Sequence, residues 1–188
     1  MLLSALTALQ IASYTAYAEK SPRNVKTLTD WEFRRDHDWK AGEGWTAVKV
    51  PHDWAITGPF SKENDLQVVA VVQNGEKQAT EKTGRSGGLP DMVKGWYRTV
   101  IDISGNLSRT ILFDGAMSEA QVLVNGVKVG EWPYGYNSFS FDITGALRQG
   151  RNEIVVLLEN RPFSSRWYPG AGLYRKVRLI ETNPVHIP

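Results

Sequence analysis

The sequence predicts an all-β fold, an antiparallel sandwich of two sheets. Three observations point to it: about nine short stretches rich in β-branched and aromatic residues, turn residues between them, and no stretch that reads as a long helix. A chain of 188 residues fits one domain of ordinary size, which can bury a core without disulfide bonds. The strand pattern indicates a domain over residues 27–182.

The first half of the chain is the less regular half. Residues 28–34 and 45–50 are predicted strands, and Pro51 ends the second because proline cannot donate to a sheet ladder. A long insertion follows over residues 60–90. Its apolar run is followed by Asn74-Gly75, which favours a small hairpin. Structureless loops of this length are uncommon unless they line a site.

The second half carries the stronger strand signals. The sequence Asn125-Gly126 between two apolar runs predicts a tight hairpin, and residues 154–158 predict a buried strand. Residues 145–152 are expected to form a short connecting turn. An aromatic cluster follows the hairpin and is more typical of core and rim packing than of a binding platform. Its members are Trp132, Tyr134, Tyr136 and Phe139. The other strands are expected at residues 96–103, 110–113, 120–124, 127–129, 138–143 and 176–180.

Composition excludes one class of partner. The 22 basic and 20 acidic residues give a net charge of only +2 and are interspersed, which argues against nucleic-acid binding. Cysteine is absent, so no disulfide can form and the redox compartment is not indicated.

The first residues predict export. Residues 1–18 carry no charged side chain, have an apolar segment and end in Ala16-Tyr17-Ala18, as secretory signals do. Residues 19–26 read as a linker. A short disordered or amphipathic leader is the alternative. We expect a periplasmic or extracellular protein without a membrane span, because no other stretch approaches transmembrane length.

Two aromatic corners are candidate sugar contacts. The loop of residues 161–175 combines turn formers with aromatic rings and guanidinium groups, which can stack on a sugar ring and bind its hydroxyls. Its candidates are Arg166, Trp167 and Tyr168. Alternatively, the rings cap the open end of the sandwich and Arg166 pairs with a carboxylate. Asp53, beside Trp54, contacts sugar or closes an Asx turn.

Catalytic groups are not recognisable. Glycoside hydrolysis needs two carboxyl groups that face each other across the scissile bond, and spacing in sequence cannot show such a pair here. The nucleophile elbow of serine hydrolases is missing, and metal-ligand spacing does not connect the histidines. We predict no metal and no cofactor.

Eight short motifs, taken together and in this order, give the chain a family resemblance from about Leu28 onward. They resemble the N-terminal sugar-binding domain of glycoside hydrolase family 2, especially of its β-galactosidase-type members. The motifs are Val50-Pro51-His52-Asp53-Trp54, Gly95-Trp96-Tyr97-Arg98, Leu112-Phe113-Asp114-Gly115-Ala116, Val122-Leu123-Val124-Asn125-Gly126, Tyr136-Asn137-Ser138-Phe139, Asp142-Ile143-Thr144, Gly150-Arg151-Asn152-Glu153-Ile154 and Trp167-Tyr168-Pro169-Gly170-Ala171-Gly172-Leu173-Tyr174-Arg175.

The resemblance implies a jelly-roll domain that packs against an immunoglobulin-like domain and a (β/α)₈ barrel with the catalytic glutamates. Residues 183–188 look like the link to the immunoglobulin-like domain. The expected function is therefore binding of a β-linked carbohydrate by one wall of a glycosidase site, and this chain by itself is expected to be inactive. Two alternatives stay open, a free-standing carbohydrate-binding module and a purely structural interface domain.

Two positions depart from the β-galactosidase pattern. Where those enzymes place a sugar-binding aspartate this chain has Arg166, and their asparagine falls near Met92, with Asp91 beside it. Arginine has donors only, so Arg166 is expected to donate to sugar oxygens or to bind an anionic substituent or carboxylate. The resemblance therefore leaves the identity of the sugar and its linkage open: a galactoside, a glucuronide, an acidic galactan or another β-linked unit.

Overall fold

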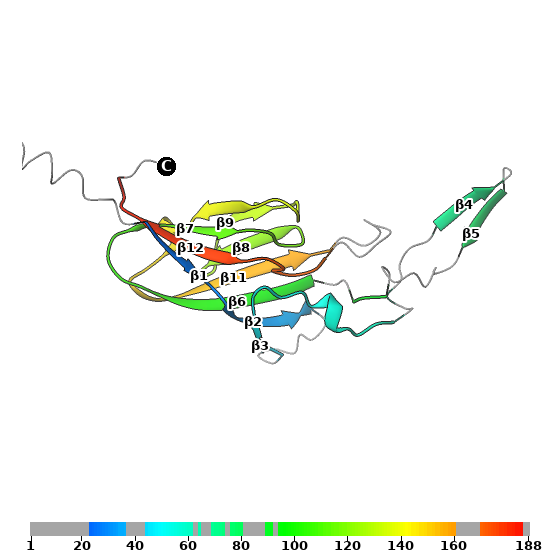
Figure 1. Cartoon of the computed structure of the whole chain (residues 1–188), viewed down its shortest axis with the longest axis horizontal. Helices are drawn as coiled ribbons and strands as arrows, with labels where there is room; N and C mark the ends of the chain where they lie inside the picture. The colour runs from blue at the N-terminus through cyan, green and yellow to red at the C-terminus, as the bar shows by residue number, and fades with distance from the viewer. Residues whose placement is uncertain are drawn as a thin grey trace, which may run out of the picture.

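A computed structural model of the chain describes residues 23–36, 44–61, 64, 69–73, 76–80, 89–91, 94–160 and 170–185. Two antiparallel sheets form the body (Figure 1), so the predicted all-β sandwich is confirmed. The first sheet has the strand order β1 (Asn24–Thr27), β12 (Val177–Thr182), β7 (Ser108–Phe113) and β10 (Phe139–Asp142). The second has the order β3 (Thr46–Lys49), β2 (Asp30–Arg35), β6 (Lys94–Ile103), β11 (Gly150–Glu159), β8 (Ala120–Val124) and β9 (Val127–Trp132).

The ten-residue strands β6 and β11 form the centre of the larger sheet. They pair along their whole length, from Gly150 opposite Ile103 to Glu159 opposite Lys94. Alternate side chains of both strands point to the interior, where Tyr97, Ile154 and other large residues are completely buried. Strand β11 begins four residues before the predicted strand, because β6 extends far enough to pair with its first residues.

Two hairpins follow their predicted turns. Asn125 and Gly126 both have positive φ, 50° and 81°, as the tight turn between β8 and β9 requires. The Asn125 side chain also donates to the carbonyl of Ala146 (2.9 Å) and to Oδ1 of Asn152 (2.8 Å). Strands β4 (Val69–Gln73) and β5 (Glu76–Thr80) pair within the long insertion. Both hairpin predictions are confirmed.

One strand lies where a linker was expected. Strand β1 pairs with β12 along Asn24–Thr27, which places the first sheet strand inside residues 19–26 and one residue beyond. All four of its side chains are exposed and only Val25 is apolar, so no hydrophobic pattern marks it. Pairing with a strand near the other end of the chain makes it a strand.

The predicted aromatic cluster is divided between core and surface. The rings of Phe113 and Phe139 stack with centroids 4.9 Å apart, and Trp132 stacks on Phe139 at 5.8 Å. These rings fill the space between the sheets beside β9 and β10. Tyr134 and Tyr136, in contrast, are 53% and 47% exposed. Trp132 and Phe139 therefore pack in the core, and Tyr134 and Tyr136 lie at its exposed rim.

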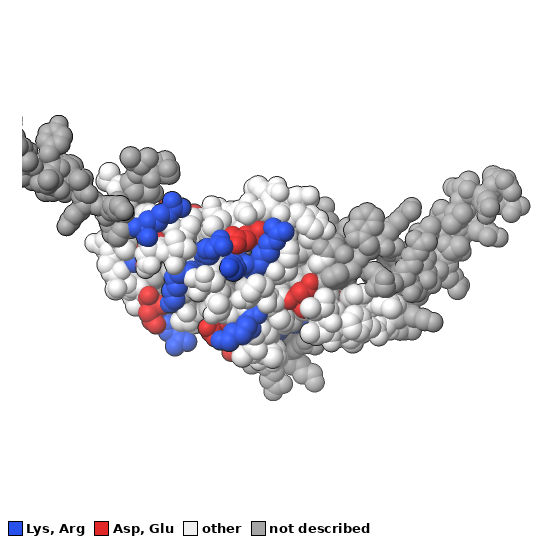
Figure 2. Space-filling model, in the orientation of Figure 1, with Lys and Arg blue, Asp and Glu red and all other residues white. Residues whose placement is uncertain are grey.

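Charge is mixed on the surface that Figure 2 shows. Basic and acidic side chains lie beside one another there, in keeping with the interspersed charges of the sequence. Among the described residues, no helix is long and apolar enough to cross a membrane.

Candidate functional site

Four segments meet at the end of the sandwich where β11 ends. They are the turn after β3, the connection between β7 and β8, the end of β11 and the segment before β12. The short 3₁₀ helix η2 (Ala55–Thr57) lies at the same end (Figure 1). His52 donates its backbone N–H to the carbonyl of Leu173 (2.8 Å), and Met117 and Gly172 exchange two backbone hydrogen bonds of 3.0 and 3.1 Å. Glu159 donates its backbone N–H to the carbonyl of Ser118 (2.9 Å). The chain is therefore held on both sides of residues 161–169, at Glu159 before them and at Gly172 after them.

The Asp53 carboxylate ties the turn after β3 to the segment before β12. Oδ1 accepts from the N–H of Ala55 (3.0 Å), which is the Asx turn considered as an alternative for this residue. Oδ2 accepts from the N–H of Ala171 (3.3 Å), 118 residues later. Partial burial raises the pKa of Asp53, and the backbone donors oppose this rise. Asp53 therefore positions the residue that follows residues 161–170, and its contact with sugar stays a prediction.

Asp91 is buried next to the same turn. It is 7% exposed, and its Oδ2 lies 3.6 Å from Nε of Arg35. Its backbone carbonyl accepts from the indole N–H of Trp54 (3.0 Å). Arg35 also donates to the carbonyls of Trp54 (2.9 Å) and Gly58. The structure thus places Asp91 in an ion pair with Arg35, whose other donors bind the carbonyls on both sides of η2. Contact of Asp91 with sugar likewise stays a prediction.

A group of buried rings supports this corner from inside. Trp54 is fully buried and stacks on Phe33 with centroids 5.4 Å apart. The backbone of β6 approaches this pair closely at Gly95, where a Cβ atom would lie 2.6 Å from the Trp54 ring. The packing of these rings therefore fixes the position of η2 relative to strands β2 and β6 of the larger sheet.

His52 and Tyr97 are the titratable members of this group. Nδ1 of His52 lies 2.7 Å from the hydroxyl of Tyr97. Burial lowers the pKa of His52, with the charge of Arg35 as a second cause, and burial raises the pKa of Tyr97 well above its usual value. Both side chains are therefore neutral near pH 7, and they form a hydrogen-bonded pair beneath the corner.

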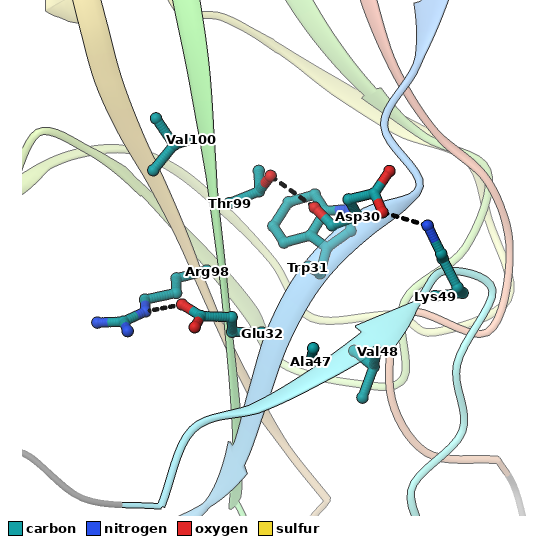
Figure 3. A pocket seen from close by; sticks show the side chains of 9 residues that line it. All are labelled: Asp30, Trp31, Glu32, Ala47, Val48, Lys49, Arg98, Thr99 and Val100. Atoms are coloured by element: carbon teal, nitrogen blue, oxygen red, sulfur yellow. Dashed lines mark hydrogen bonds and ion pairs between the residues drawn. The ribbon is translucent and has the colours of Figure 1, made fainter.

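Two hollows lie beside the corner. One of about 190 Å³ is lined by Arg35, His52, Trp54 and Thr57 together with residues of β2 and β3. A groove of about 440 Å³ runs along the outer side of β2, β3 and β6 (Figure 3). Its charged residues are already paired, Lys49 with Asp30 and Arg98 with Glu32. The groove therefore presents balanced charge rather than a site for one sign of ligand.

Three of the predicted site residues, Arg166, Trp167 and Tyr168, lie outside the described residues. Sequence reasoning missed Arg35 as the partner of Asp91. No local signal marks it, because the two residues meet only when β2 pairs with β6, which places Arg35 opposite Gly95. Among the described residues, no group of three His, Asp or Glu side chains could hold a metal ion.

Comparisons with known proteins give consistent relatives. No family model matches the chain. It is 36% identical to a β-galactosidase of Bacteroides ovatus over a match that covers 97% of the chain and 20% of that protein. It is 37% identical to a putative β-glucuronidase of Formosa agariphila, over 76% of the chain and 12% of that protein. The chain thus spans about a fifth of the length of these relatives, or less.

Solved structures agree with these relatives. A β-glycosidase from Bacteroides vulgatus matches 88% of the chain and 21% of its own, with a TM-score of 0.66 and 30% identity. A glycosyl hydrolase family 2 member from Bacteroides cellulosilyticus matches 87% of the chain and 21% of its own, with a TM-score of 0.67 and 29% identity.

Proposed function

The chain belongs to glycoside hydrolase family 2 and corresponds to the N-terminal domain of its β-galactosidase-like members, and on that premise we propose that it contacts the saccharide in such an enzyme. The observation that carries the proposal is the 36% identity to a β-galactosidase across 97% of this chain, in a match that spans only 20% of that relative. We propose that this fifth of the enzyme supplies part of its saccharide site.

The proposed contribution of the domain is a rigid wall that presents residues 161–169. Hydrogen bonds from Glu159 to Ser118 and between Met117 and Gly172 support it, because they fix both flanks of that segment. Asp53 adds a third anchor through the N–H of Ala171. A segment with fixed ends loses less conformational freedom when it binds a ligand. The catalytic carboxyl groups are then expected in a barrel domain elsewhere in a longer protein.

The proposed ligand is a β-linked galactoside or glucuronide. Trp167 and Tyr168 offer faces on which a pyranose ring can stack, and Arg166 offers planar donors. Arginine donors suit both sugar hydroxyls and the carboxylate of a uronic acid. One relative is named a β-galactosidase and the other a putative β-glucuronidase. These names support a β-linked galactoside or glucuronide as the ligand and do not decide between the two sugars.

Two experiments test the proposal. The purified chain should not hydrolyse nitrophenyl β-galactoside or β-glucuronide above a heat-treated control, and turnover would contradict the division of roles. In the longer enzyme, Arg166→Ala should raise KM or lower kcat at least tenfold, about 1.4 kcal/mol. The matched control is Arg151→Ala, at the opposite end of β11, where the side chain is exposed. Equal kinetics of both variants would remove Arg166 from the site.

A free-standing carbohydrate-binding module would behave differently. Measurable affinity of the isolated chain for an oligosaccharide, in an organism whose gene encodes no barrel after it, would favour that alternative.

Export belongs to the same proposal. Residues 1–18 are expected to be removed, so the mature protein from the periplasm or medium should begin at Glu19. Mass spectrometry of the mature N-terminus tests this, and recovery of the uncleaved chain from the cytoplasm would contradict it.

A further inference from the structure

Two tyrosines form an exposed corner on the connection between β9 and β10. Tyr134 and Tyr136 are 53% and 47% exposed, and their rings meet edge to face with centroids 5.6 Å apart. Exposed apolar groups gathered in one place commonly mark a contact site. Each of these rings also carries a hydroxyl, so the corner combines apolar faces with hydrogen-bonding tips.

The connection that carries these rings is held firmly. Gly135, between the two tyrosines, is buried, and its carbonyl accepts from the hydroxyl of Tyr174 (2.7 Å). A Cβ atom at Gly135 would lie 2.2 Å from the sulfur of Met117, so the backbone packs directly on that side chain. Glu119 donates its backbone N–H to the carbonyl of Pro133 (3.1 Å). The rings are therefore presented in a fixed place, which lowers the entropy cost of binding.

The segment before β12 adds a third ring and a cation. Tyr174 is half-buried, and the guanidinium of Arg175 lies 5.2 Å from the centre of its ring. Arg175 is exposed and donates to the carbonyl of Asp114 over 3.4 Å, a long hydrogen bond that leaves most of its five donors for other partners. Phenol rings and a guanidinium from two distant segments thus share one small surface.

This surface lies beside Gly170 and Gly172, the described residues that follow residues 161–169 in the chain. Met117 packs against Gly135 and also forms the two backbone hydrogen bonds with Gly172. Its side chain would lie 3.8 Å from a Cβ atom at Gly170, the first described residue after that segment. A saccharide bound next to Gly170 would therefore have the tyrosine corner as its neighbour.

We propose that Tyr134 and Tyr136, with Arg175 beside them, form a second saccharide subsite that takes a further β-linked pyranose of an oligosaccharide. This inference rests on the proposed function. Pyranose faces carry C–H groups that pack on aromatic rings, and the phenol hydroxyls and the guanidinium bind the hydroxyls at the rim. The subsite determines the preference for chain length, while residues 161–169 contact the terminal unit.

The test compares two substrates of the longer enzyme, a nitrophenyl β-glycoside and a β-(1→4)-linked tetraose of the same sugar, which is galactose or glucuronic acid according to which nitrophenyl glycoside the enzyme hydrolyses. Tyr134→Ala and Tyr136→Ala should each lower kcat/KM for the tetraose at least fivefold and change it less than twofold for the nitrophenyl glycoside. Tyr136→Phe keeps the ring and should lose less than Tyr136→Ala. Val127→Ala, 58% exposed in the distant hairpin turn, is the control and should leave both values unchanged.

The outcomes separate the subsite from the proposed function. If the enzyme acts on both substrates and the tyrosine variants leave the tetraose-to-monoglycoside ratio unchanged, the subsite is overturned and the proposed function stands. If the variants lower both values equally or lower the melting temperature by several degrees, the tyrosines contact another domain and the subsite is again overturned. If the wild-type enzyme hydrolyses no β-galactoside and no β-glucuronide, both proposals fail.

Discussion

The substitution Gly172→Ala should destabilise the domain strongly, although it adds only one methyl group. Gly172 has φ of +95°, where a residue with a Cβ atom costs about 1–2 kcal/mol. The new Cβ atom would also lie 2.5 Å from both the carbonyl oxygen of His52 and the hydroxyl of Tyr97. Neither neighbour can retreat easily, because His52 is held by Leu173 (2.8 Å) and Tyr97 is fully buried. Overpacking of this kind costs about 1–3 kcal/mol more.

The sum, about 2–5 kcal/mol, is a large part of the stability of an ordinary domain. Urea unfolding of the purified chain, followed by tryptophan fluorescence, measures it. Gly126→Ala is the matched control, since Gly126 has a similar φ of +81° but open space around it. The difference between the two variants isolates the crowding at His52 and Tyr97. If Gly172→Ala were no more destabilising than Gly126→Ala, the described packing of this corner would be wrong.

Three further predictions address the buried polar groups. Tyr97→Phe should lower the free energy of unfolding by about 1–2 kcal/mol, because it removes the hydroxyl that lies 2.7 Å from His52; urea unfolding of both proteins tests this. His52 has a pKa below 6.5 in the folded state, so its contribution to stability is complete above pH 6.5 and is lost as the pH falls below it. The loss between pH 7.5 and 5.5 should be smaller in His52→Gln, and an equal loss would exclude His52 as its source. Arg109 is 3% exposed and lies 2.8 Å from Glu181, so Arg109→Met should cost about 3 kcal/mol, whereas Lys49→Met at an exposed pair should cost less than about 1 kcal/mol. Comparable melting temperatures for these last two variants would refute the difference.

Turn chemistry and side-chain alternation were readable without coordinates. Asn125-Gly126 predicts a tight hairpin because both residues tolerate positive φ, and the structure has values of 50° and 81° there. The apolar residues 154–158 predict a buried strand, and they lie in β11 at the centre of the larger sheet. Both signals depend on a few neighbouring residues, so they do not require knowledge of the rest of the chain.

Exposure of the aromatic cluster could not be read in the same way. Trp132 and Phe139 pack in the core, whereas Tyr134 and Tyr136, only a few residues away, are exposed. The tyrosines carry a hydroxyl, but this does not settle their exposure, since Tyr97 is fully buried in the same fold. Which of them faces outward depends on where Gly135 packs against Met117, a contact between distant segments.

The sequence by itself determined the fold class, most strand positions and the family, because these follow from local periodicity, turn residues and motif order. Only the tertiary structure decided the partners at the end of the sandwich. The carboxylate of Asp53 meets the N–H of Ala171 across 118 residues, and Asp91 meets Arg35 because β2 pairs with β6. Such partners depend on the register of non-adjacent strands and on how their loops pack. The Trp54 ring is buried at the same end and donates to the carbonyl of Asp91. Its burial depends on the same packing of distant segments, so no local sequence pattern encodes these contacts.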